Sequence, residues 1–150
     1  MTTRKLTKAE VAATPYKTWN AYIDLLANEN HDNLAPEQRP AHLVFWYESE
    51  VQNGGHLQYF ENRRGRYLQE TVAALRALGA SNQASVLTEA IALWKSVERS
   101  RIEPADEFCE EALEGEFSNL DQRFHECSPS LQECLEKHLE QNRSSFVTIE

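Results

Sequence analysis

Apolar residues recur at intervals of three and four residues along almost the whole chain. This is the spacing of one face of an α-helix, and it repeats in separate segments that glycines and prolines divide. No segment alternates apolar and polar residues over enough positions to predict a strand. The pattern therefore predicts an all-α protein, a compact single-domain bundle of about seven helices with no significant sheet.

Residues 1–150 are expected to form this one domain, because no repeat or flexible linker interrupts them. The core is expected over 15–140, and it stays open whether the ends, 1–6 and 144–150, are ordered. Thr7 and Glu10 have the spacing of a capping box, which predicts a short first helix. Ser128-Pro129 is expected to start the last helix.

The net charge is confined to the second half of the chain. Residues 1–80 carry nine acids and nine bases, whereas 81–150 carry fifteen acids and six bases, which accounts for the net charge of −9. Within 103–126, nine acids accompany a single base, Arg123. Nucleic acid and anionic membranes would repel such a chain, so direct binding to either is not expected. A concentrated anionic region favours encounter with a basic protein.

Composition also bears on the compartment. The longest apolar run, 43–47, is far too short to cross a bilayer, and no secretory signal is visible at the N-terminus. The three cysteines, Cys109, Cys127 and Cys134, have no disulfide-framework spacing. We therefore expect a cytoplasmic protein, without a cofactor or a bound metal.

The acids concentrate on one predicted helix, which Pro104 is expected to open and Gly115 to break. At about 100° per residue, its carboxylates fall on one arc of the helix and its apolar residues on the opposite arc. One charge per roughly 3 Å of axis is close to the roughly 3.4 Å per phosphate of a DNA strand. We therefore predict a partner-binding acidic face. Its members are Glu103, Asp106, Glu107, Glu110, Glu111, Glu114, Glu116, Asp121 and Glu126.

The alternative is that this acidic face only keeps the protein soluble, as charged helix faces commonly do. Like charges three or four residues apart cost a few tenths of a kcal/mol per pair, and hardly any base is interleaved to offset that cost. The sequence leaves both interpretations open.

A second distinctive segment surrounds a double glycine. A helix that is apolar on nearly all sides, and is hence expected to be central, should end at Gly54-Gly55 and be followed by a helical turn over 56–62. Glu50 lies on the inward face of that helix, where a carboxylate needs hydrogen-bond donors, and the backbone N–H groups of residues 54–56 could supply them. An architectural corner is favoured over an active site. Its structural motif comprises Glu50, Asn53, Gly54, Gly55, Gln58, Phe60, Asn62 and Gly65.

The stretch from Glu50 to Gly65 resembles the signature of the DMP-type DNA-mimic protein family, bacterial acidic all-helical proteins formerly described as a domain of unknown function. That signature runs acid-Val-x-Asn-Gly-Gly-aromatic-x-Gln-aromatic-Phe-x-Asn, with a glycine shortly after. The chain departs from it at His56, where the family usually has an aromatic residue. The likeness extends over about 15–140 and implies an all-α fold and binding to a DNA-binding protein. Mimicry itself would depend on each member's own acidic surface.

A zinc site is a rival interpretation of the cysteines. His125 with Cys127, and Cys134 with His138, offer zinc ligands, but the gap between the two cysteines is not a usual zinc-knuckle spacing.

An acid–base cluster of Glu48, Glu50 and His56 would suit an enzyme, but no nucleophile, phosphate-loop or metal-helix motif accompanies it. We therefore do not expect an enzyme.

The sequence thus predicts a non-enzymatic acidic protein that binds a basic protein. In the sharper form it is a DNA mimic that occupies the DNA-binding surface of a transcription factor or nucleoid protein and so regulates transcription. An immunity-type inhibitor of a basic toxin or nuclease would use the same face, and an interaction module with merely solubilising acids is the third possibility. Arg63, Arg64 and Arg66 could bind an anion, but they are expected to pair with surface acids, including those of a second protomer in a homodimer.

Overall fold

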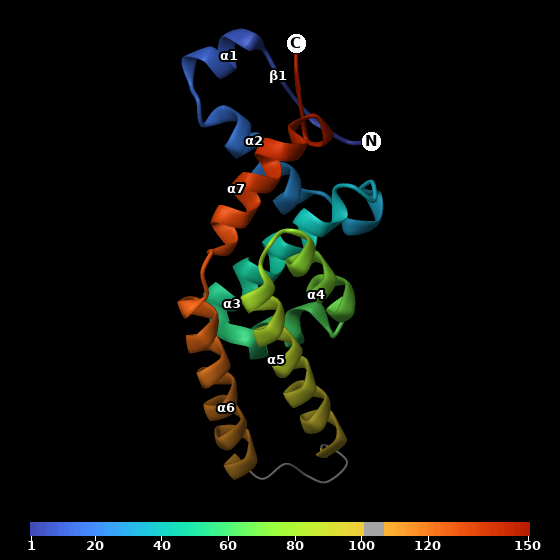
Figure 1. Ribbon diagram of the computed structural model, residues 1–150. Coiled ribbons are helices and arrows are strands. Elements are labelled where there is room, and N and C mark those ends of the chain that lie inside the picture. Colours follow the sequence, from blue (N-terminus) through green and yellow to red (C-terminus); the bar gives the residue numbers. More distant parts are fainter. Residues whose placement is uncertain (101–106) are drawn as a thin grey trace.

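A computed structural model shows the fold of the chain (Figure 1). It describes the backbone of residues 1–100 and 107–150 and, within these ranges, all side chains except those of 97–100, 107–114 and 116. The described elements are β1 (Arg4–Leu6), α1 (Lys8–Ala13), α2 (Lys17–Asn28), the 3-10 turn η1 (His31–Asn33), α3 (Arg39–Arg63), α4 (Leu68–Ala77), α5 (Ser81–Ser100), α6 (Glu107–Glu126), α7 (Leu131–Asn142), the 3-10 turn η2 (Arg143–Ser145) and β2 (Val147–Ile149). The predicted all-α class is confirmed, with seven α-helices in the described part of the chain.

Helix α3 is the centre of the molecule. Helices α2, α4, α6 and α7 all pack against it, and α5 lies between α4 and α6. In Figure 1 the two chain ends, α1 and α2 occupy one end of the molecule, while α5 and α6 extend side by side at the other. The α3 sequence is apolar on most sides because it has neighbours on most sides.

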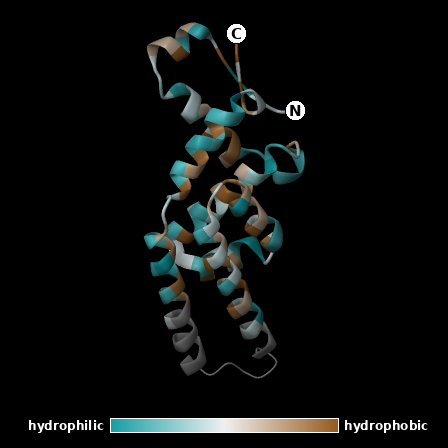
Figure 2. Cartoon of the chain, viewed as in Figure 1, coloured by the Kyte–Doolittle hydropathy of each residue, from teal (hydrophilic) through white to brown (hydrophobic). Residues whose placement is uncertain are grey.

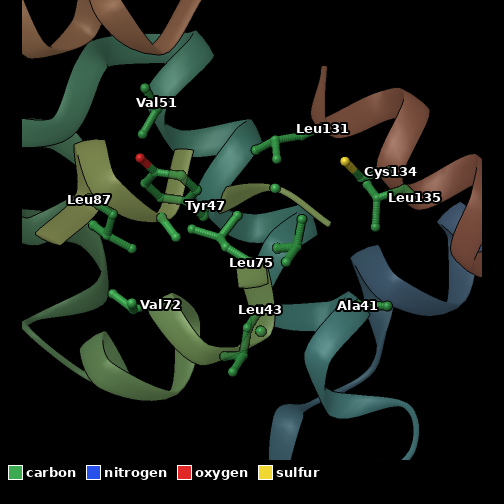
Figure 3. Close-up of a cluster of buried hydrophobic side chains, with 14 of the residues drawn as sticks. Ala41, Leu43, Tyr47, Val51, Val72, Leu75, Leu87, Leu131, Cys134 and Leu135 are labelled. Atoms are coloured by element: carbon green, nitrogen blue, oxygen red, sulfur yellow. The ribbon is translucent and has the colours of Figure 1, made fainter. Parts of the chain in front are cut away.

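The core is continuous and rich in aromatic side chains. Figure 3 shows Tyr47 of α3 among aliphatic residues from other helices, with Leu75 from α4, Leu87 from α5 and Leu131 from α7. All four are buried. One core therefore holds together helices that are far apart in the sequence.

The expectation that there is no strand misses a small feature. β1 and β2 pair in parallel, with Arg4 opposite Val147 and Leu6 opposite Ile149, so the two ends of the chain are ordered against each other. Gln38, which is fully buried, joins this pair to α3. Its side-chain amide donates to the carbonyl of Thr2 at 2.6 Å and to that of Ser145 at 2.8 Å.

The predicted helix boundaries are mostly correct. Thr7 and Glu10 form the expected capping box, and Gly79, with φ +84°, follows the end of α4. Two boundaries are wrong. α6 continues through Gly115 because an isolated exposed glycine costs only about 1 kcal/mol in a helix. The last helix is capped by Ser130, whose hydroxyl accepts from the Glu133 N–H, so it begins at Leu131.

No helix among the described residues is long and apolar enough to cross a membrane. In Figure 2 hydrophilic and hydrophobic residues alternate along the helices, as expected when each helix has one face in the core and another in solvent.

Candidate functional site

The predicted acidic face falls largely outside the described side chains. Glu103 and Asp106 precede the described start of α6, and so does the predicted opening at Pro104. Of Glu107, Glu110, Glu111, Glu114 and Glu116, only the helical backbone is described. The remaining two predicted members, Asp121 and Glu126, are described, and they lie in different surroundings.

Glu126 is exposed and accepts a hydrogen bond from Gln122, one turn earlier in α6, at 3.2 Å. The single base of the acidic segment, Arg123, contacts Glu89 of α5 at 2.6 Å. Both side chains of this pair are substantially exposed, so it contributes little to stability. Its consequence is local: the guanidinium of Arg123 is directed to α5 and not to an acid of its own helix.

Asp121 is turned toward the double-glycine corner. Its Oδ1 accepts from the backbone N–H of His56 at 2.8 Å and from Nδ1 of the same residue at 2.6 Å. Burial alone would raise the pKa of Asp121, but the two hydrogen bonds from His56 outweigh it, so the pKa is lowered. The spacing of Asp121 from the buried Phe117, Leu120 and Phe124 could have indicated this inward placement.

The corner is a break in the backbone of α3. Gly54 has φ −154° and ψ 17°, and Gly55 has φ 80° and ψ −178°, and the helical hydrogen bonding resumes after them. The helix therefore kinks at the glycine pair, and the predicted helical turn over 56–62 is the second half of α3. The break frees the N–H of His56 from the helix, and Asp121 of α6 accepts it, as a side chain at a helix start commonly does.

Each position of the pair requires a glycine for a specific steric reason. A Cβ at Gly54 would lie 1.9 Å from Oε1 and 2.9 Å from Cβ of Gln58. A Cβ at Gly55 would lie 2.3 Å from Oδ2 of Asp121. Gly55 also has a backbone conformation that is almost confined to glycine. A side chain at Gly55 would therefore prevent the close approach of α3 and α6, whereas a side chain at Gly54 would clash within α3 itself.

Glu50 does not bond to the backbone N–H groups of the corner, contrary to the expectation from the sequence. Its Oε2 accepts from Nδ2 of Asn62 at 2.7 Å and from Nε2 of Gln58 at 3.1 Å. The kink folds the second half of α3 so that these two amides reach back across it. Three polar members of the motif therefore bridge the kink, while Phe60 is fully buried and stacks on Trp94 with ring centroids 5.2 Å apart.

His56 joins a buried chain of hydrogen bonds that the sequence does not reveal. Its Nε2 lies 2.7 Å from the hydroxyl of Tyr47, and its Nδ1 faces Asp121. Because an ionised carboxylate only accepts, Nδ1 carries a proton, and in the neutral imidazole the Tyr47 hydroxyl donates to Nε2. An aromatic residue at position 56 would fill similar space without these bonds. The one feature of the sequence that points to these hydrogen bonds is the departure from the family pattern at His56.

Two of the four zinc candidates, Cys127 and His138, have other hydrogen-bond partners. Cys127 donates through Sγ to the Arg123 carbonyl at 3.2 Å, Cys134 is buried, and Nδ1 of His138 lies 3.3 Å from the Tyr22 hydroxyl. No group of three or more candidate metal ligands occurs among the residues that the structure describes.

Glu48 accepts from Gln52 at 3.1 Å, and so does not share a hydrogen-bond partner with Glu50 or His56.

The corner lies within a segment that matches a known protein family. The family model described as DMP19-like protein matches residues 32–142, which is well over half of the chain. The chain belongs to the DMP19-like protein family. The match begins in η1 and ends with α7, so it contains the whole kinked helix and its contact with α6. Curated proteins and solved structures give no match.

The resemblance found in the sequence is thus confirmed. In this DMP19-like chain, the motif side chains with described hydrogen bonds are those of Glu50, Gln58 and Asn62. Their hydrogen bonds connect the two halves of α3 across the kink, which is an architectural role. Asn53 and Gly65 are exposed, and Gly65 has φ +68°.

Proposed function

We propose that this DMP19-like protein is a non-enzymatic, cytoplasmic protein that binds a basic, DNA-binding partner. In this proposal, the carboxylates of the acidic segment occupy the positions on the partner that DNA phosphates would otherwise hold. The observation that carries the proposal is the continuity of α6 from Glu107 to Glu126. An unbroken backbone maintains the helical spacing on which the predicted charge pattern depends.

Two further features support this proposal. Helix α6 packs against α3 and α5, and its N-terminal half extends with α5 away from the end where the chain termini lie (Figure 1). The single base within 103–126, Arg123, is engaged by Glu89. The charge of an acidic helix accelerates encounter with a basic surface.

The test is a pull-down from host lysate at low and high salt, with duplex DNA as competitor. In the test variant, four glutamates of the acidic face are changed to Gln: Glu107, Glu110, Glu111 and Glu114. A control variant loses the same charge from exposed acids elsewhere: Glu37, Glu61, Glu70 and Glu140. Because the net charge of both variants is equal, any difference between them reports the location of the acids.

The expected result is a DNA-binding protein that wild type and control both capture, that duplex DNA releases, and that the test variant does not retain. Binding should weaken steeply with salt, as protein–DNA binding does. Equal capture by all three baits, or affinity unchanged between low and near-molar salt, contradicts the proposal. Capture of a nuclease whose activity is then inhibited, with no competition by DNA, supports the toxin-inhibitor function in its place.

A further inference from the structure

A polar cavity of about 560 Å³ lies between the C-terminal end of α2, η1 and the C-terminal end of α3. This is within the usual size of small-molecule sites. The cavity lies apart from the acidic helix, and the proposed function does not involve it. Its basic side chains are those of Arg63, Arg64 and Arg66.

Arg63 forms one wall of this cavity. Its guanidinium lies over the indole ring of Trp46, 5.2 Å from the ring centroid, and that ring is held by a hydrogen bond from Nε1 to the Leu26 carbonyl at 3.1 Å. Burial lowers the pKa of Arg63 from its ordinary value. A guanidinium fixed in this way presents its N–H groups in a defined direction.

None of the three arginines has a carboxylate partner in the described part of the chain. The expected pairing with surface acids is therefore not found within the described part of this protomer. Two carboxylates do line the cavity, but each has another partner. Glu29 contacts Arg4 at 3.0 Å, and Asp32 accepts from the Tyr67 hydroxyl at 3.3 Å. Glu29 is paired with Arg4, whereas the neutral Tyr67 hydroxyl leaves the charge of Asp32 in place, so three arginines face one unpaired carboxylate in the cavity lining.

The loop that carries these arginines has a strained backbone. Arg64 has φ 54° and Tyr67 has φ 57°, both in the left-handed region that residues other than glycine seldom adopt, and Gly65 lies between them with φ 68°. Each such residue costs on the order of 1 kcal/mol. Strain of this kind concentrates at functional sites, and here it holds the loop in the wall of the cavity.

Two histidines, His31 and His42, also line the cavity. His42 is 3% exposed, its Nδ1 lies 3.2 Å from Nδ1 of His31, and its Nε2 has no hydrogen-bond partner of acceptable geometry in the described structure. The ring of His31 packs on that of Tyr67, with centroids 4.4 Å apart. The Glu29 backbone carbonyl interacts with this ring, but not with hydrogen-bond geometry, so a bound ligand or water would satisfy Nε2 better.

We propose that this cavity binds a phosphate monoester of small-molecule size. Guanidinium groups match the geometry and charge of phosphate oxygens, and three arginines in excess over one unpaired carboxylate suit a dianion better than a singly charged carboxylate. The rings of Trp46, Tyr67 and His31 line the same space and give an organic group a surface to contact. A polymeric phosphate chain would be repelled by the net charge of −9, whereas a small dianion experiences mainly the local field.

Calorimetric titration of the full chain tests this proposal, with phenyl phosphate, inorganic phosphate and benzoate as separate probes. Phenyl phosphate should bind most tightly, inorganic phosphate more weakly, and benzoate weakest. Arg63→Gln and Arg66→Gln should each weaken phenyl phosphate binding by about tenfold or more. Arg66 is exposed, so its variant tests the site even where loss of the Arg63–Trp46 contact unfolds the chain.

The matched control is Arg76→Gln, which removes one exposed base on α4 outside the cavity. It should leave phenyl phosphate affinity unchanged. The proposal is overturned by absence of binding at about 10 mM phenyl phosphate. It is equally overturned when benzoate binds as tightly as phenyl phosphate, or when Arg76→Gln weakens binding as much as Arg66→Gln.

Discussion

Replacing Gly55 with alanine should destabilise the protein through two separate effects. Gly55 has φ 80° and ψ −178°, which an alanine adopts only at a cost of about 1–3 kcal/mol. The new Cβ would also lie 2.3 Å from Oδ2 of Asp121. Asp121 is a short side chain held by two hydrogen bonds from His56, so it can move only by lengthening or breaking them.

Hydrogen bonds to charged groups contribute about 1.5–3 kcal/mol each, and the lower part of that range applies because Asp121 is partly exposed. With the backbone strain, the expected loss for Gly55→Ala is about 3–5 kcal/mol in the free energy of unfolding. This is a large share of the about 5–15 kcal/mol by which domains are stable. Urea denaturation followed by far-ultraviolet circular dichroism measures it.

Two other glycines serve as controls. Gly79 has φ +84° and an added Cβ there would meet nothing within 4 Å, so Gly79→Ala should cost only the backbone strain, about 1 kcal/mol. Gly115 is exposed in the middle of α6 with equally open surroundings, so Gly115→Ala should stabilise by about 0.5–1 kcal/mol. In an Asp121→Ala background, the clash is absent and Gly55→Ala should also cost only the strain. The reasoning is refuted when Gly55→Ala costs no more than Gly79→Ala, or when its cost is unchanged without Asp121.

Three further predictions concern the core. Phe60→Ala should cost about 3–5 kcal/mol, because the ring is fully buried on Trp94, and a loss under about 1 kcal/mol in denaturant would contradict that packing. Tyr47→Phe should cost about 1–3 kcal/mol by leaving Nε2 of His56 without a donor, and an unchanged denaturation midpoint would show that this bond contributes nothing. Burial lowers the pKa of His42 from 6.5 to about 4, so between these values the unfolded chain binds more protons and stability falls as pH falls. His42→Asn should reduce that slope by up to about 1.4 kcal/mol per pH unit, and identical slopes in both proteins would exclude the effect.

The helices could be predicted from the sequence because each carries its own apolar stripe and its own end signals. The stripe containing Leu131, Leu135 and Leu139, for example, is buried as its spacing indicates. The importance of the double glycine is also evident in the sequence, since two adjacent glycines after a long apolar helix indicate a break or a corner. In each case, the residues that determine the structure lie within a short stretch of the sequence.

The errors concern interactions between distant residues. The strands β1 and β2 are three residues long, and each is recognisable only beside the other, so no local pattern reveals them. The partner of the His56 N–H is 65 residues away on α6, and sequence spacing gives no measure of that distance in space. The sequence around Gly115 predicts a break, and that prediction is wrong because α6 is continuous there. This glycine lies on the exposed side of the helix, and which side is exposed depends on how α6 packs.

The pairing of β1 with β2 has a consequence for how the chain folds during synthesis. β1 is synthesised long before β2, so the pair cannot form until all the helices between them have been made. Closing a loop of this length in an otherwise disordered chain would cost about 4 kcal/mol of entropy, which two short strands could not repay. The helices between them must therefore assemble first and bring the ends together. Until Ser145 is in place, Gln38 lacks one of the two carbonyl groups to which its buried side chain donates.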